Sequence, residues 1–316
     1  MIWLSWRRQR TETFVAGAIL ALLVALLVPS GLEMAHAYHR DGLGSCLTAS
    51  TSDSCDQAIS SFTSRFSSIS SFIAWLTLVP GLIGVLLAAP FVLELEQGTY
   101  RLAWTQSVTR GRWIATKLGL AVGAGAVAAL AFTLLVTWWR APLVHLQGRM
   151  EQSVFDSEGI VVFGYTLFAL GLATAIGVVW RRGVAAVVVG FAGYFAARIF
   201  VDTWLRQRLL APIHAKWPLT ASDPAFIRHG WVLNEYPSGR FGQRGMPPLA
   251  LCPPPRALGD KASAGDCLAR HGYVMNAIYE PASRFWALQG IETSLFLGAA
   301  VLLLAFAAVW TYRRAG

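Results

Sequence analysis

Six long apolar runs, separated by polar segments, dominate the pattern of the chain. Each run is long enough to cross a hydrocarbon core about 30 Å thick, which takes roughly 20 residues of α-helix. The runs are continuously apolar and do not alternate, so helices are expected and barrel strands are not. The predicted spans cover residues 14–32, 72–93, 118–139, 159–180, 183–201 and 287–312. The pattern therefore predicts an all-α integral membrane protein with six transmembrane helices.

Composition agrees with this interpretation. The chain has 316 residues, of which 55% are hydrophobic and 14% charged, and its mean hydropathy is +0.51. These values are too apolar for an ordinary soluble domain. The formal charge of +9 could indicate a nucleic-acid partner, but the basic residues gather in the short segments on one side of the predicted spans. We therefore expect membrane lipid, and no nucleic acid, as the partner of this charge.

The distribution of basic residues also predicts orientation. Eleven basic residues lie in short segments on one side: Arg7, Arg8, Arg10, Arg101, Arg110, Arg112, Lys117, Arg181, Arg182, Arg313 and Arg314. The short loops on the other side hold Arg40, Arg65, Arg140 and Arg149. Short loops rich in Lys and Arg stay in the cytoplasm. Both termini are therefore expected to be cytoplasmic.

Residues 1–13 read as an interfacial segment on the inner leaflet, because Trp3 and Trp6 stand beside Arg7, Arg8 and Arg10. An alternative is a cleavable signal peptide, since a basic start and an apolar run precede the small-residue pattern at 35–37. The two readings predict different mature N-termini.

Four cysteines test the orientation independently. Cys46, Cys55, Cys252 and Cys267 all fall in segments placed outside by the charge distribution. Disulfides persist in oxidising compartments, so two bridges are plausible. Proximity favours Cys46 with Cys55 and Cys252 with Cys267, although four cysteines permit three pairings. A metal site is the alternative, and no CxxC spacing supports it.

Residues 202–286 form the one sizeable region outside the predicted membrane spans. Prolines are frequent there, and no strand or helix period is sustained. This composition predicts a turn-rich extracytoplasmic cap between spans five and six. The domains are thus the segment 1–13, spans one to five over 14–201, the cap 202–286, and the sixth span with a cytoplasmic tail over 287–316.

Charges inside the apolar runs are rare and are therefore informative. Arg198 lies near the outer end of the fifth span, and Asp202 follows at a spacing of four, which suits an ion pair on one helix face. Glu292 lies near the outer end of the sixth span. Either Arg198 pairs with Glu292 across helices, or both face an aqueous cavity used by substrate.

Small residues mark possible helix contacts. Gly119 with Gly123 on the third span, and Gly190 with Gly193 on the fifth, permit close approach within the chain or across a dimer.

The sequence lacks the motifs of several common enzyme classes. The chain has no GxxxxGK[ST] loop, no GxSxG and no HExxH, so no catalytic residue is predicted and no ATP hydrolysis by P-loop chemistry is expected. His36 and His39 have HxxH spacing, but two isolated histidines at a membrane exit are more often solvated, and no metal site is predicted. Energy for any transport must come from a partner.

The segment 94–117, ELEQGTYRLAWTQSVTRGRWIATK, is a charged and aromatic island between the second and third spans. Gly98 can end the second span, and Thr99 can cap a short helix over 100–106. Ser107 or Thr109 is a second cap candidate. The expected result is a short helix along the inner membrane surface, with acidic and basic residues around it.

This island resembles the first inner loop of permease subunits of type-2 ABC exporters, particularly actinobacterial ones. The resemblance implies a coupling helix that docks on two copies of a cytoplasmic ATP-binding subunit, with ATP and Mg²⁺ in that partner and no cofactor here. It also implies a second permease subunit, expected to form a homodimer. The residues assigned to coupling are Glu94, Glu96, Gly98, Thr99, Arg101, Thr105, Arg110, Arg112 and Trp113.

The function expected from this resemblance is export of an amphipathic or lipophilic compound, such as a drug or antibiotic, across a bacterial plasma membrane. The cap is longer than in simple members of the family. Three alternatives remain: an ordinary solvated inner loop in place of a coupling site, an integral membrane enzyme using the cap, or a sensor whose cap binds a ligand.

Overall fold

The computed structural model describes residues 10–46, 53–67, 72–100, 109–219, 224, 227, 229–239 and 267–314. Its elements are α2 (Arg10–Arg40), α3 (Leu43–Cys46), α4 (Asp53–Arg65), α6 (Ile73–Leu76), α7 (Val79–Glu96), α9 (Arg110–Gln147), α10 (Gln152–Phe155), α11 (Val161–Trp180), α12 (Gly183–Phe200), the π-helix η1 (Val201–Leu205), α13 (Arg206–Leu209), β1 (Ile213–Pro218), β2 (Trp231–Ser238), β3 (Val274–Glu280), the 3₁₀-helix η2 (Ala282–Arg284) and α16 (Phe285–Arg314).

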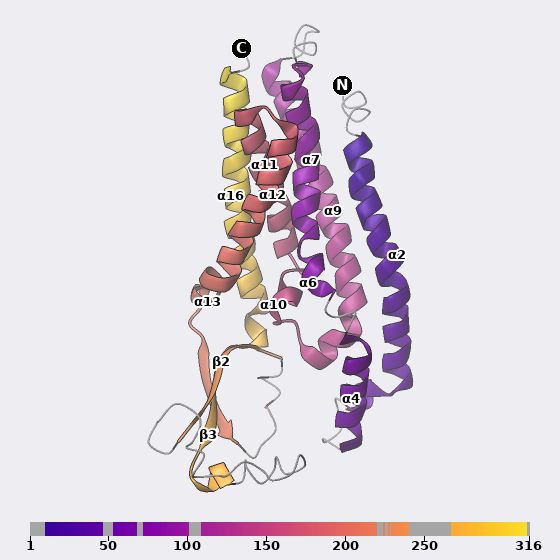
Figure 1. The fold of residues 1–316 in the computed structure, drawn as a ribbon, viewed down its shortest axis with the longest axis vertical. Coiled ribbons are helices and arrows are strands. Elements are labelled where there is room, and N and C mark those ends of the chain that lie inside the picture. The colour runs from indigo at the N-terminus through magenta and orange to yellow at the C-terminus, as the bar shows by residue number, and fades with distance from the viewer. Residues whose placement is uncertain are drawn as a thin grey trace.

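Six of the described helical segments are long and apolar enough to cross a membrane, which confirms the predicted number of spans. They form an elongated bundle (Figure 1). The described ends of the chain both lie at one end of the bundle, and the sheet and α4 lie at the other. Below, these ends are called the terminal end and the sheet end.

Helix α11 is the centre of the bundle. It packs against α16, α7, α12 and α9, whereas α2 packs mainly on α9. Small side chains allow this crowding: a Cβ added to Gly190 of α12 would lie 2.9 Å from Cα of Ala173, and one added to Gly171 would lie 3.1 Å from the carbonyl oxygen of Ala300. The predicted close contact at Gly190 is therefore present. A Cβ added to Gly119 or Gly123, by contrast, would meet no other described atom within 4 Å.

The helices are longer than their apolar runs. The third span was predicted over 118–139, but α9 extends through Arg110–Gln147, including Pro142. The fifth was predicted to end at 201, but helical structure continues to Leu209. Hydropathy identifies only the part of a helix that lies in lipid. Polar turns at the helix ends are not apolar, so the predicted spans are shorter than the helices.

The region predicted as a turn-rich cap contains a three-stranded antiparallel sheet in the order β1-β3-β2. The sequence shows no sustained strand period in this region, so the sheet was not predicted. The alternation is weak because β2 carries a bulge between Val232 and Asn234, and Pro218 and Pro237 lie in the strands. A small core of Trp217, Ile227, Ala277 and Tyr279 covers one face.

Cys46 and Cys55 form a disulfide near the sheet end, as proximity predicted. Cys267 is also disulfide-bonded, and Cys252 lies outside the described residues. Among the residues that the structure describes, no group of three or more His, Cys, Asp or Glu side chains could hold a metal ion.

Candidate functional site

Two polar sites occupy opposite ends of the bundle. They are named after the orientation that the charge distribution predicts. The inner site is the described part of the segment 94–117 at the terminal end. The outer network, at the level where the spans meet the sheet, consists of Asp156, Tyr165, Arg198, Asp202, Arg206 and Glu292.

At the inner site, α7 stops where the sequence predicts. Its last residue is Glu96, and Gly98 adopts a positive φ of 68°, the left-handed conformation that favours glycine after a helix. Thr109 occupies the N-cap position of α9 without a side-chain capping hydrogen bond. Residues 101–108 lie outside the described part of the chain, so the predicted helix over 100–106, with Arg101 and Thr105, stays a prediction.

The acidic residues of the inner site bond within the chain. The Glu94 carboxylate accepts from the Lys117 ammonium at 2.5 Å, with the two side chains 12% and 4% exposed. The Glu96 carboxylate accepts from the backbone N–H of Gly183 at 2.7 Å, at the first residue of α12. A carboxylate there satisfies an orphan N–H and complements the helix dipole. Both acids brace the loop against neighbouring helices.

Other members of the predicted coupling set divide by exposure. Trp113 is buried, with its ring 5.4 Å from Phe91 and 6.4 Å from Tyr100. Thr99 is partly buried, and its hydroxyl lies 3.5 Å from the Glu94 carbonyl oxygen. Arg110 and Arg112 are exposed. The exposed side chains of this part of the loop thus include the basic Arg110 and Arg112 and the acidic Glu96, while Trp113 is buried.

Arg206 is the centre of the outer network. Its Nε lies 2.9 Å from Glu292 Oε2, its Nη1 lies 2.6 Å from Asp202 Oδ1, and its Nη2 contacts Asp156. Glu292 is fully buried and Arg206 is 2% exposed. Such charges are tolerated away from water only when they are paired and hydrogen-bonded.

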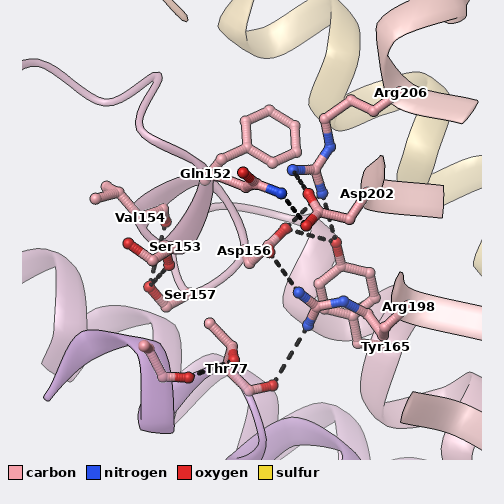
Figure 2. Close-up of polar contacts among 12 residues, drawn as sticks. Thr77, Gln152, Ser153, Val154, Asp156, Ser157, Tyr165, Arg198, Asp202 and Arg206 are labelled. Carbon is pink, nitrogen blue, oxygen red and sulfur yellow. Dashed lines mark hydrogen bonds and ion pairs between the residues drawn. The ribbon is translucent and has the colours of Figure 1, made fainter. Parts of the chain in front are cut away.

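Arg198 holds the other side of Asp156 (Figure 2). Its Nη1 donates to the Thr77 carbonyl oxygen at 3.3 Å, and its guanidinium lies 4.1 Å from the centre of the Tyr165 ring. The Tyr165 hydroxyl contacts both Asp156 and Glu292. Asp156 therefore links α11, α12 and α13, while Thr77 ties the start of α7 to the same cluster.

These contacts correct two expected pairs. Arg198 does not bond Glu292 directly: Arg198 bonds Asp156, and Glu292 bonds Arg206. Asp202 pairs with Arg206, four residues later, and not with Arg198. The physical reason is that helical structure continues through η1 into α13, which brings in Arg206, and that Asp156 enters from the turn before α11. The broader expectation of structural pairing among the intramembrane charges agrees with this geometry.

Asp156, Tyr165 and Arg206 are absent from the sequence-based set. Asp156 and Arg206 lie just beyond the predicted ends of spans, where charge is ordinary, and Tyr165 is unremarkable within an apolar run. The signal that could have found Asp156 is its place in the short acidic segment immediately before the fourth span.

A second buried pair lies beside the network. Arg140 Nε is 3.5 Å from Glu158 Oε1, with side chains 1% and 2% exposed, and Arg149 approaches the same carboxylate at 4.0 Å. Burial raises the pKa of the Glu158 carboxyl, and the charges of Arg140 and Arg149 oppose that rise. Gln289 secures the same turn, donating to the carbonyl oxygens of Phe155 and Glu158 and accepting from the N–H of Val161.

A cavity of about 460 Å³ adjoins the network. Its polar lining includes Glu151, Asp156, Arg198 and Asp202, and its apolar lining comes from α6, the start of α7 and α12. A cavity of this size can hold a small organic molecule.

In a comparison with protein families, a model described as ABC-2 membrane transporter related matches residues 17–206. This range includes five spans, the inner site and most of the outer network. Comparisons with curated proteins and with solved structures find no match. Because the family model covers more than half of the chain, we conclude that this multi-pass membrane protein belongs to the ABC-2 membrane transporter related family, as a permease of the ABC-2 type.

Proposed function

We propose that the chain is the permease subunit of an ATP-driven exporter that moves an amphipathic or lipophilic compound out of a bacterial cell. The family match over 17–206 carries this proposal, because ABC-2 permeases work with an ABC ATP-binding subunit. The absence of a P-loop motif from the sequence agrees with that division of labour. ATP and Mg²⁺ would bind in the partner, present in two copies, and a second permease subunit would complete the assembly in the plasma membrane.

The inner site is the proposed docking surface. Arg110 and Arg112 are exposed at the start of α9, and Gly98 turns the chain from α7 into the loop that carries Arg101 and Thr105. The Glu94–Lys117 pair joins α7 to α9, and Glu96 joins α7 to α12. A movement of this loop would therefore be transmitted to the three spans α7, α9 and α12.

Helix α12 offers a direct route from the inner site to the outer network. Its first residue, Gly183, is held by Glu96, and Arg198 lies on the same helix. At 1.5 Å per residue, the two positions are about 22 Å apart along the axis. We propose that ATP binding closes the partner subunits, moves the loop and α12 together, and shifts the equilibrium toward an outward-open state.

Charge reversal at one exposed inner residue tests docking. We expect Arg112→Glu to reduce ATP hydrolysis by the assembled complex at least fivefold, because like or mismatched charges at an interface cost several kcal/mol. Arg313→Glu is the matched control, since Arg313 is also exposed at the terminal end but lies outside the loop. Wild-type hydrolysis and transport in Arg112→Glu, at normal expression, would contradict docking at this surface.

A further inference from the structure

The cavity beside the outer network has both apolar and acidic lining residues. Phe195 and Ile199 of α12 are 45% and 46% exposed on the surface of the bundle, and they line the cavity together with Leu78. The lining also contains the carboxylates of Glu151, Asp156 and Asp202. A molecule filling this space would meet both apolar side chains and acidic groups.

The charges of the network do not balance. Asp156, Asp202 and Glu292 supply three carboxylates, and Arg198 and Arg206 supply two guanidinium groups, which leaves one negative charge. Asp202 is the least buried of the three acids, with a side chain 17% exposed, and it lines the cavity. A cation in the cavity could therefore compensate the excess negative charge of the network.

Other nearby charges do not supply that balance. Arg140 and Arg149 approach Glu158, Arg140 is also attracted by Glu151, and neither arginine lines the cavity, so the two arginines and the two glutamates cancel among themselves. Glu151 lines the cavity and is exposed. The ionisable lining of the cavity is thus three carboxylates against the single guanidinium of Arg198.

The site does not suit a hard metal ion. Both oxygens of Asp202 already accept, from Gln152 and Arg206, and both oxygens of Asp156 are in contact with Arg198 or Arg206. A hard cation requires several carboxylate or carbonyl oxygens of its own. A cation with dispersed charge requires only a negative potential and an apolar surface.

We propose that this cavity binds a lipophilic monovalent cation, whose apolar body lies against Phe195, Ile199 and Leu78 and whose charge faces Asp202 and Glu151. Phe195 and Ile199 belong to the membrane-spanning part of α12, so the ligand enters from the lipid side near the sheet end. This inference rests on the proposed function and narrows its cargo class from any amphipathic compound to a cation.

The test uses the purified full-length permease in nanodiscs of zwitterionic phosphatidylcholine, without an ATP-binding subunit. The probe is radiolabelled tetraphenylphosphonium, and tetraphenylborate is its isostere of opposite charge. We expect saturable binding of one phosphonium per chain, and weaker binding of the borate. Asp202→Asn should weaken phosphonium affinity roughly tenfold, as expected for loss of a partly buried charge partner.

Further variants keep the test informative if Asp202→Asn does not fold. Glu151→Gln changes an exposed residue outside the network and should weaken binding by a few fold, and Phe195→Ala should weaken binding of both probes. Glu33→Gln is the control, because Glu33 pairs with Arg65 and does not line the cavity. It should leave affinity unchanged.

No saturable phosphonium binding, tighter binding of the borate, or wild-type affinity in the folded cavity variants would overturn the inference. Because the binding assay contains no partner, its failure leaves the proposed function standing if an ATP-binding subunit still co-purifies. If the permease binds phosphonium but no ATP-binding subunit co-purifies, the cation site stands and the proposed function fails.

Discussion

At the scale of single residues, arginine chemistry explains the outer network. A guanidinium presents its N–H donors in a planar fork, so one Arg206 side chain can bond Glu292, Asp202 and Asp156 in different directions. A lysine ammonium would not match this geometry. The cost of burying these charges is offset only while all partners are present.

Removal of Arg206 should therefore be strongly destabilising. We expect Arg206→Gln to lower stability by about 3–5 kcal/mol, because three carboxylates would then share one guanidinium. Thermal unfolding in detergent, followed by tryptophan fluorescence, measures the effect. Arg208→Gln is the matched control: Arg208 is exposed, lies against Trp204, and should change stability by roughly 0.5 kcal/mol or less.

A double variant separates charge from packing. Adding Glu292→Gln to Arg206→Gln removes one of the uncompensated acids, so the pair should be less damaging than the sum of the single changes. Strict additivity would contradict the pairing described for these two residues.

The residues of the network could be predicted only in part. Arg198, Asp202 and Glu292 stand out because charge within or next to an apolar run is rare, but their partners were assigned wrongly. Spacing along one helix suggests Arg198 with Asp202. The spacing says nothing of Asp156, which lies in the turn before α11 and contacts Arg198 and Arg206 in the structure.

At the scale of elements, the turn between α11 and α12 shows how a tight connection is held. Arg181, the C-cap of α11, has a φ of 52°, and it is the one described residue other than glycine with positive φ. Two residues later α12 begins at Gly183, whose N–H donates to Glu96. The turn thus combines a strained residue with a capping carboxylate.

The strain at Arg181 gives a paired prediction. Arg181→Gly and Arg181→Ala both remove the charge, but only alanine keeps the Cβ that disfavours left-handed backbone. We expect the glycine variant to be more stable than the alanine variant by about 1 kcal/mol. The same unfolding assay compares them, and an alanine variant equal to or more stable than glycine would show that the turn is not strained at this residue.

Whether a segment forms a helix or a strand was predictable for the segments that lie in lipid. The six apolar runs all became helices, since every backbone group inside a membrane must be satisfied locally. The sheet of the cap was not predictable, because long-range pairing of β1 with β3 depends on residues more than fifty positions apart. The bulge in β2 breaks the alternation that would reveal a strand.

At the scale of the whole molecule, the two ends of the bundle carry different polar groups. The terminal end carries the inner site with Glu94 and Glu96, and the sheet end carries the buried outer network and its adjoining cavity. Helix α11 packs against four other spans between them, and α12 touches both sites. Movement at one end is therefore expected to alter the other.

If this ABC-2 permease works with a separate ATP-binding subunit, the two proteins should co-purify from mild detergent. The permease would be isolated after co-expression with the product of its neighbouring open reading frame, and the complex analysed for composition and ATP hydrolysis. We expect a P-loop ATPase in stoichiometric amount, with two copies for two permease subunits, and hydrolysis that requires the complex. Recovery of folded permease with no ATPase partner would contradict the proposed function.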